Sequence, residues 1–407
     1  MKFHEEPTEA LMRGAPPSES AQVTIENFLA PPFNRWGFRN IRRILPTANV
    51  WRGDGPTAPF ETVPRDLDGV AFEDREGRSM TVAAMLGEGY TDGFLVLHQG
   101  RIVTERYFNG FQPHQQHLLM SVTKSFAGSL TGILVERGDL DVDRLVTDVL
   151  PELAGSAYDG ATLRHVLDMT VGTDFNDLMT TDYDDPTSDM VWLDMASGWR
   201  VRDDPAAPDN LRDFLKTVRP SGTHGEVFHY VSAHTDVLGW MLERASGRHF
   251  ADLLSREIWQ PMGAEFNAYI SVDRLGAPLT DGGLCVTLRD LARFGQLHLH
   301  DGIANGRRIV PFEWITDIRE NGDREAWARG DFVKYFPHAR YRSKWYQKGD
   351  AHDAAFGIGV HGQTIYVDRT AGMVIAKLST HPQSIDDKLF DDMFRGFVAI
   401  GHHLADG

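Results

Sequence analysis

The chain contains 407 residues, of which 42% are hydrophobic, 24% charged and 10% aromatic. This mixture is typical of a globular protein and excludes a disordered chain, a collagen-like repeat and a coiled-coil rod. The net charge of −17, from 41 basic and 58 acidic residues, disfavours nucleic acid and anionic lipid as partners, because an acidic surface repels phosphate groups. The length favours two interleaved lobes, or one domain with a large insertion, over a single core.

Cysteine usage and the N-terminal segment bear on the cellular compartment. Cys285 is the only cysteine, so the chain cannot form an internal disulfide or a cysteine-based zinc site. The first residues include acidic side chains where a signal peptide needs a basic start and then an apolar run. No stretch approaches the length of apolar chain that spans a bilayer. We therefore expect a cytoplasmic protein with no membrane contact.

The predicted elements begin with an extended arm. Residues 1–35 are rich in Pro, Glu and Ser and should wrap the body of the protein. The spacing of NRWGFRNIRRIL predicts a helix that starts at Asn34 and is ended by Pro46. Residues 93–109 favour two strands that meet at Gln99-Gly100, which predicts a hairpin.

The middle of the chain is predicted to be helical. The segment SVTKSFAGSLTGILVERG places apolar side chains on one face and stops at Gly138. Further helices are expected over HTDVLGWMLERASG, ended by Gly247, and LRDLARFGQLHLHDG, ended by Gly302. Residues 356–379 predict two strands that turn at Thr370-Ala371-Gly372, and LFDDMFRGFVAIGHHL predicts a closing helix.

Strands are therefore expected at both ends of the chain, with a helical block between them. This order predicts an α/β fold with an antiparallel sheet built from both termini, flanked by helices and carrying an inserted helical domain. We assign residues 1–120 to the N-terminal arm and the first strands of the α/β domain. Residues 121–250 form the mainly helical domain, and residues 251–407 complete the α/β domain.

The first candidate for chemistry is Ser121-Val122-Thr123-Lys124. A serine hydroxyl is a weak nucleophile until a base removes its proton, and residues three apart share a helical face, so Lys124 can reach the Ser121 oxygen. If Ser121 opens the helix, free N–H groups and the helix dipole surround the developing oxyanion. We expect burial and neighbouring positive charge to lower the pKa of Lys124, so that its neutral amine acts as base. On its own, such a pair is more often an exposed helical pair than a catalytic one.

Two later segments make the first one more specific. Tyr230-Val231-Ser232 lies between a polar loop and a helix start. The tyrosine hydroxyl there could share a proton with the serine and the lysine and later protonate a leaving group, although simple packing is the alternative. The glycines of Gly357-Ile358-Gly359-Val360-His361-Gly362 allow a strand to approach closely, so that an N–H faces a substrate carbonyl. The same string matches a dinucleotide fingerprint, which we reject because further strand, not a helix, follows it.

The order Ser-x-x-Lys, Tyr-x-Ser and glycine-flanked strand is far more specific than any one part. With these segments the sequence resembles the serine β-lactamase and penicillin-binding superfamily, particularly its class C and esterase branch. The segments FNRWGF, HLLMSVTKS, VLPELAGSAYDG, SAHTDVLGW, CVTLRDLAR and GIGVHGQTIYVD are similar to those of the nylon-oligomer (6-aminohexanoate-dimer) hydrolase family. This resemblance runs from about Phe33 to about Ser379.

The resemblance implies a β-lactamase/transpeptidase-like fold and hydrolysis of a small amide or ester through an acyl-serine, without metal or cofactor. It implies Ser121 as nucleophile, Lys124 as its base and Tyr230 as the proton-shuttling third member. The backbone N–H groups of Ser121 and Val360 would form the oxyanion hole. A homodimer is the oligomeric state expected for the group.

The resemblance also implies substrate-binding positions. Tyr183 matches a tyrosine that contacts the substrate amide from a loop, and Asp194 matches an acidic position that binds the substrate's amino group. Asp281 stands where we expect Asn, which argues against specificity for linear aminohexanoate. His361, beside the oxyanion strand, could line the cleft or simply be packed. Gly357-Ile358-Gly359 offers no cation or hydroxyl for a penicillin carboxylate, so recognition of penicillins should be poor.

Other functions stay open at this point. A carboxylesterase, a weak β-lactamase or a D-amino-acid peptidase would use the same scaffold, and a non-catalytic ligand sensor would keep only the fold. No Gly-x-Ser-x-Gly or His-Glu-x-x-His motif occurs, which disfavours an α/β-hydrolase and a zinc peptidase. The 17 histidines are scattered, and the acidic run 182–189 lacks the spaced ligands of a calcium loop, so we predict no metal site.

Overall fold

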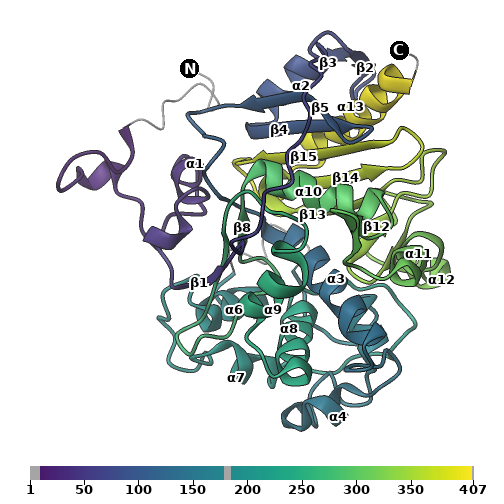
Figure 1. Cartoon of the computed structure of the whole chain (residues 1–407). Coiled ribbons are helices and arrows are strands. Elements are labelled where there is room, and N and C mark those ends of the chain that lie inside the picture. Colours follow the sequence, from purple (N-terminus) through teal and green to yellow (C-terminus); the bar gives the residue numbers. More distant parts are fainter. Residues whose placement is uncertain (1–9, 178–184, 406–407) are drawn as a thin grey trace.

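A seven-stranded antiparallel sheet is the largest element of the computed structural model, which describes residues 10–177 and 185–405 (Figure 1). Strands from the N-terminal part of the chain join strands from its C-terminal part, because β4 pairs with β15. The prediction that both ends of the chain build the sheet is confirmed. The order across the sheet is β11 (Arg340–Arg342), β12 (Trp345–Gln347), β13 (Ala355–Gly359), β14 (Gln363–Asp368), β15 (Met373–Ser379), β4 (Thr91–His98) and β5 (Arg101–Tyr107).

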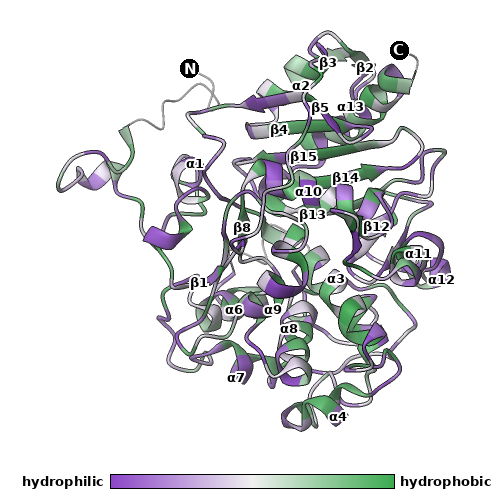
Figure 2. Ribbon diagram, viewed as in Figure 1, coloured by the Kyte–Doolittle hydropathy of each residue, from purple (hydrophilic) through white to green (hydrophobic). Residues whose placement is uncertain are grey.

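Helices cover both faces of this sheet. Leu95 and Leu97 of β4 belong to the same apolar cluster as α10 (Leu288–Leu299), whereas Phe94 and Val96 belong to the cluster of α13 (Asp387–Ala405). Because successive side chains of a strand point to opposite faces, a continuous apolar run suits a strand that is covered on both sides. Figure 2 shows this as hydrophobic colour along the central strands. Each fully buried side chain of this kind stabilises the fold by roughly 1.5–3 kcal/mol.

A mainly helical region lies below the sheet in Figure 1. Its centre is the packing of α3 against α8, and α3 is buried along almost its whole length. Gly128 lets the β11–β12 turn pack directly on α3, because a Cβ at this position would overlap the carbonyl of Ser343 in that turn. The helices of this region are α3 (Thr123–Glu136), α4 (Val146–Val149), α5 (Leu163–Leu167), α6 (Asp189–Ser197), α7 (Leu211–Leu215), α8 (Ala233–Ser246) and α9 (Phe250–Leu254).

A smaller sheet within the described ranges leads the chain into the helical region. Its strands pair antiparallel in the order β1 (Thr47–Val50), β7 (Ala268–Ser271), β8 (Leu284–Val286) and β6 (His117–Leu118). The other α-helices and strands are short: α1 (Asn34–Gly37), β2 (Ala71–Glu73), β3 (Ser79–Thr81), α2 (Val82–Glu88), β9 (Ile303–Ala304), β10 (Arg307–Arg308), α11 (Phe312–Glu320) and α12 (Arg324–Ala328). The domain limits at 120 and 250 stay a prediction. Within the described ranges, every helix is too short or too polar to cross a membrane.

Several predicted turns and helix ends are confirmed. β4 and β5 form the expected hairpin, and Gln99 and Gly100 at its tip have the positive φ angles of 50° and 78° that a tight hairpin turn requires. Gly138 and Gly247 follow α3 and α8 with φ angles of 77° and 65°. These are the left-handed positions in which glycine commonly ends a helix.

Gly302 is confirmed as the end of α10 (Leu288–Leu299): it is left-handed (φ 81°), and its N–H donates to the Leu297 carbonyl at 2.8 Å. Two other predicted boundaries are wrong. The helix from Asn34 stops at Gly37, because Asn40 (φ −135°) leaves helical geometry and only a short 3-10 turn follows. The stretch predicted as one strand up to Asp368 is divided into β13 and β14 by a turn at residues 360–362, where His361 is left-handed (φ 61°).

Candidate active site

Ser121 lies where the chain enters the buried helix α3. It belongs to a single 3-10 turn, Met120–Val122, that runs directly into the helix, so the prediction that Ser121 opens a helix is confirmed. β8 holds both sides of this turn: the Leu119 N–H donates to the carbonyl of Leu284 (2.9 Å), and the Leu284 N–H donates to Thr123 Oγ1 (3.2 Å). Met120, directly before the serine, has a φ of 47°. Such backbone strain is typical of functional positions that the surrounding structure holds firmly.

The Lys124 side chain is the centre of the polar network. Its Nζ donates to Ser121 Oγ at 2.7 Å, to the Asp281 carbonyl oxygen at 2.7 Å and to Ser232 Oγ at 3.2 Å. Lys124 is only 1% exposed. Since an ammonium group has three hydrogens to donate, these contacts satisfy its charged form completely.

The charge state of Lys124 differs from the sequence prediction. Burial lowers the pKa of this amine, but its interactions with Tyr230, Asp281 and Asp177 more than offset burial, so the pKa of Lys124 is raised. Asp281 Oδ2 lies 4.0 Å from Nζ. The prediction of a lowered pKa was wrong because it assumed positive neighbours. In the resting protein Lys124 is an ammonium group.

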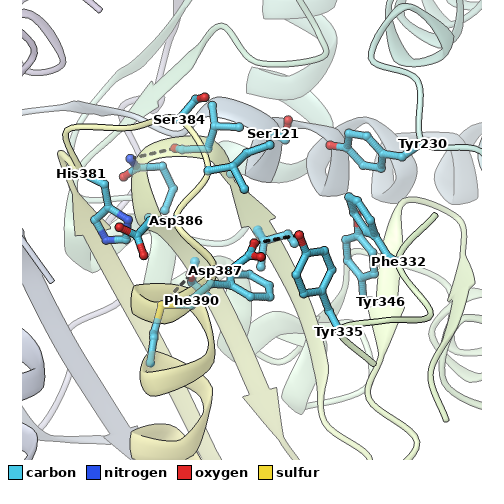
Figure 3. Close-up of a pocket in the computed structure, with 18 of the residues that line it drawn as sticks. Ser121, Tyr230, Phe332, Tyr335, Tyr346, His381, Ser384, Asp386, Asp387 and Phe390 are labelled. Carbon is cyan, nitrogen blue, oxygen red and sulfur yellow. Dashed lines mark hydrogen bonds between the residues drawn. The ribbon is translucent and has the colours of Figure 1, made fainter. Parts of the chain in front are cut away.

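Tyr230 reaches the same serine from the loop before α8. Its side chain interacts with both Ser121 and Lys124, and Figure 3 shows its hydroxyl pointing toward Ser121. The Lys124 Nζ lies 5.2 Å from the centre of its ring. Burial raises the pKa of Tyr230 and the charge of Lys124 offsets this only in part, so the phenol holds its proton at neutral pH. The Tyr230 N–H donates to Asp331 Oδ2 at 2.9 Å, which fixes this part of the loop.

Val360 lies beside Ser121 because β13 approaches the serine turn very closely. A Cβ added at Gly359 would lie 2.6 Å from the Leu119 carbonyl oxygen and 3.0 Å from the Ser121 nitrogen. Any larger residue at Gly359 would therefore push the strand away from the serine. The expected close approach is present, and Ser121 and Val360 border the same cavities.

A cavity of about 860 Å³, named here the carboxylate cavity, lies on one side of Ser121. Asp194, Asp281 and His361 line it, so the structure brings these predicted substrate-binding residues to one cavity next to the serine. Tyr183 lies outside the described residues. Trp199 forms part of the wall, and its Nε1–H donates to Ser271 Oγ at 2.9 Å.

Asp194 and His361 contribute differently to this cavity. Burial raises the pKa of Asp194 to about 7, although Arg200, whose Nη2 is 3.9 Å from Oδ2, lowers it in part. Burial lowers the pKa of His361 to about 4, so its imidazole is neutral. The His361 Nδ1–H donates to the carbonyl of His381 at 2.7 Å, and its backbone N–H donates to the carbonyl of Ser384 at 2.9 Å. His361 therefore fixes the turn that carries Val360.

Two acidic residues near Lys124, Asp236 and Asp177, were not predicted from the sequence. Asp236 of α8 accepts hydrogen bonds from the Asp281 N–H (3.1 Å) and from Thr280 Oγ1 (3.2 Å). Asp177 accepts from the Ser232 N–H at 2.7 Å. Burial raises the pKa of both acids, that of Asp177 to about 6. Among the residues that the structure describes, no group of His, Cys, Asp and Glu side chains is arranged to hold a metal ion.

A smaller cavity of about 210 Å³, named here the aromatic pocket, lies on the Tyr230 side of Ser121 (Figure 3). Phe332 stacks against Tyr230 and against Tyr346, with ring centres 5.2 and 6.0 Å apart. No sequence pattern apart from Tyr230 predicted this pocket, since its aromatic residues are spread over distant segments. Its main lining residues are Tyr230, Phe332, Tyr335, Tyr346, Ile358 and Phe390.

Comparisons with known proteins agree with this geometry. The family model described as beta-lactamase matches residues 82–400. The chain is 40% identical over 367 residues to the 6-aminohexanoate-dimer hydrolase of Paenarthrobacter ureafaciens, which covers 90% of each protein. It is 32% identical over 180 residues to esterase EstB of Burkholderia gladioli, or 40% of this chain and 41% of that protein. A solved structure from Bacillus anthracis, provisionally named a 6-aminohexanoate-dimer hydrolase, has a TM-score of 0.87 and 29% identity over 96% of this chain and 99% of that one.

Proposed function

Because the chain belongs to the β-lactamase family of serine hydrolases, we propose that Ser121 is the nucleophile and accepts the acyl group of a small amide or ester. The observation that carries this proposal is the contact of Ser121 Oγ with the Lys124 ammonium at 2.7 Å, with the Tyr230 side chain interacting with both residues. A serine at a helix start, beside a closely approaching strand, also has backbone N–H groups near the site of developing charge.

Acylation requires the removal of the Ser121 proton. Lys124 as an ammonium cannot accept it, so one proton must first leave the Lys124–Tyr230 pair, which titrates as a unit. The resulting amine or phenolate takes the serine proton while Oγ bonds to the carbonyl carbon of the substrate. The N–H groups of Ser121 and Val360 stabilise the oxyanion, and one such donor is worth roughly 10²–10³-fold in rate.

Tyr230 then serves the leaving group. The bond from the carbonyl carbon to nitrogen or oxygen breaks, and the phenol donates a proton to the departing amine or alcohol. Water attacks the acyl-serine, gives up a proton to the same pair of groups and releases the carboxylic acid. Ser121 recovers its proton, so the cycle consumes only water.

We assign the acyl part of the substrate to the carboxylate cavity. An ionised Asp194 would pair there with the amino group of an aminoacyl chain, which favours an amide with a 6-aminohexanoyl acyl part, as in the 6-aminohexanoate dimer named for the 40% identical relative. Tyr183 is proposed as a further contact to the substrate amide. A short-chain carboxyl ester is the second candidate, because the similarity to esterase EstB extends over 180 residues.

We also propose a compartment, a partner and an oligomeric state for the enzyme. We propose the cytoplasm as its compartment, supported by the single, buried Cys285, and a small molecule as its partner. A homodimer remains the oligomeric state that we propose from the family resemblance.

Substitution of the nucleophile tests the proposal. Ser121→Ala should lower kcat/KM for a p-nitrophenyl ester by at least about a thousandfold and abolish labelling by a fluorophosphonate. Ser246→Ala, at the end of α8, is the matched control and should behave like the wild type. Full activity of the Ser121 variant would contradict the mechanism, and a wild-type protein that fails to react with the label would favour the ligand sensor.

A further inference from the structure

We propose that the aromatic pocket receives the leaving group and selects an uncharged aryl or apolar amine over an amine that carries a carboxylate. This inference rests on the proposed function. Its starting point is Tyr230, which lines the aromatic pocket, whereas Ser232 and Asp281 line the carboxylate cavity on the other side of the serine. A proton donor must lie within hydrogen-bond reach of the atom it protonates. The departing nitrogen therefore lies on the Tyr230 side.

The walls of the aromatic pocket fit a flat, apolar group. Phe332 lies nearly parallel to Tyr230 and Tyr346, at interplanar angles of 24° and 21°. Phe390, at the start of α13, meets Tyr335 edge to face at 5.8 Å. The volume of about 210 Å³ exceeds the roughly 150 Å³ of an apolar cavity that holds one benzene ring. One substituted ring, or an alkyl group of similar size, fills such a space.

The rim of the pocket is acidic. Asp331, Asp386 and Asp387 line it together with a single lysine, Lys334. The ammonium of Lys334 lies over the ring of Tyr335, 4.5 Å from its centre. The Tyr335 hydroxyl in turn donates to Asp387 Oδ1 at 2.8 Å, a contact visible in Figure 3.

The N-terminus of α13 could have offered a site for an anion, because free N–H groups and the helix dipole attract negative charge. Here the chain's own side chains already occupy that position. Asp386 Oδ1 accepts the Leu389 N–H at 2.9 Å, and Asp387 follows in the first turn. A leaving group with its own carboxylate would meet like charge at this rim, which disfavours it.

The remaining rim acid is held in place by the catalytic loop. Asp331 Oδ2 accepts the Tyr230 N–H and pairs with His229 Nδ1, both at 2.9 Å. Burial lowers the pKa of His229, but Asp331 more than compensates, so that the pKa of His229 is raised. Asp331 is therefore engaged by His229, whereas Asp386 and Asp387 present the charge that repels a carboxylate.

A pair of substrates isolates the charge of the leaving group. The amides of 6-aminohexanoic acid with 4-aminobenzamide and with 4-aminobenzoate share the acyl part and the ring and differ in one carboxylate. With the full-length enzyme at pH 8, kcat/KM should be at least about tenfold higher for the benzamide. Asp387→Asn should lower this ratio severalfold, and Lys334→Gln should raise it, because the two variants change the rim charge in opposite directions.

The ring itself is tested separately. Phe332→Ala should lower kcat/KM for both aryl amides about tenfold relative to 6-aminohexanoyl methylamide, each normalised to the amount of enzyme that a fluorophosphonate labels. Equal kcat/KM for the two aryl amides, or a ratio that neither rim variant changes, would overturn the inference while labelled Ser121 still supports the proposed function. A protein that neither hydrolyses a p-nitrophenyl ester nor labels at Ser121 would overturn the proposed function itself.

Discussion

The carboxylate cavity and the aromatic pocket both border Ser121 and Val360, yet they differ in size and in the side chains that form their walls. The former is large and contains the buried acids Asp194 and Asp281, and the latter is small and walled by stacked rings. The division follows from the two proton-carrying side chains: Lys124 contacts the residues of one side, and Tyr230 forms the wall of the other. Recognition of the acyl part and of the leaving group therefore depends on separate residues, which can be altered one at a time.

The largest expected effect is the loss of anilide hydrolysis when the Tyr230 hydroxyl beside the aromatic pocket is removed. Tyr230→Phe keeps the ring but removes the proton that an amine needs to depart, so kcat/KM for an anilide should fall about 10³-fold. A p-nitrophenyl ester should lose only about tenfold, because p-nitrophenolate departs without a proton. Initial rates for the two substrates at pH 8 measure the difference.

Tyr366→Phe on β14 is the matched control, since this buried tyrosine is not among the lining residues of either cavity. Its kinetics should stay within about twofold of the wild type. An equal loss for the anilide and the ester in Tyr230→Phe would show that the phenol acts only on Ser121. The aromatic pocket would then lose its assignment to the leaving group.

The next largest effect is expected in the carboxylate cavity, where the charge of Asp194 should control the preference for an amino substrate. The pKa of Asp194 is raised to about 7, so its side chain is neutral below that pH and ionised above it. The preference for a 6-aminohexanoyl anilide over a hexanoyl anilide should therefore increase as the pH rises through this value. Asp194→Asn should abolish the increase and lower the preference about tenfold at pH 8, the value of one charge-assisted hydrogen bond.

Asp189→Asn, five residues earlier in the same helix, provides the control because Asp189 is not among the lining residues of the carboxylate cavity. Its selectivity should equal that of the wild type at each pH. A preference for the amino substrate that survives in Asp194→Asn would assign amine recognition to a different group.

The parts of the site that could be predicted are those that depend on local spacing. Ser121 and Lys124 are one helical turn apart, so their contact follows from the sequence once a helix is expected there. The charge of Lys124 could not be predicted, because Asp281, which helps to set it, is 157 residues away. The aromatic pocket could not be predicted for a related reason: Phe332, Tyr346 and Phe390 lie on separate segments of the chain. In addition, the sequence does not distinguish an aromatic residue of the core from one that lines a pocket.

The fold shows the same limit. The antiparallel sheet from both ends was predictable, because apolar runs such as β4 and β15 indicate strands regardless of their partners. The turn between β13 and β14 was not predictable, because it depends on a left-handed His361. A histidine in a sequence does not indicate a left-handed backbone. That conformation is stabilised by contacts with His381 and Ser384, which lie some twenty residues further along the chain.

The smallest expected effect is a shift in the pH profile, which tests whether the carboxylate cavity influences the chemical step. Asp281 is one of the groups that raise the pKa of Lys124, so Asp281→Asn should lower that pKa and free the amine at lower pH. The acid limb of kcat/KM for a neutral ester should shift to lower pH, with a gain of about threefold at pH 6 and little change at pH 9. A purely structural effect would scale the whole profile without moving it. If the acid limb of the pH profile does not shift, Asp281 serves substrate binding alone. The two cavities would then differ in substrate recognition but not in their influence on removal of the Ser121 proton.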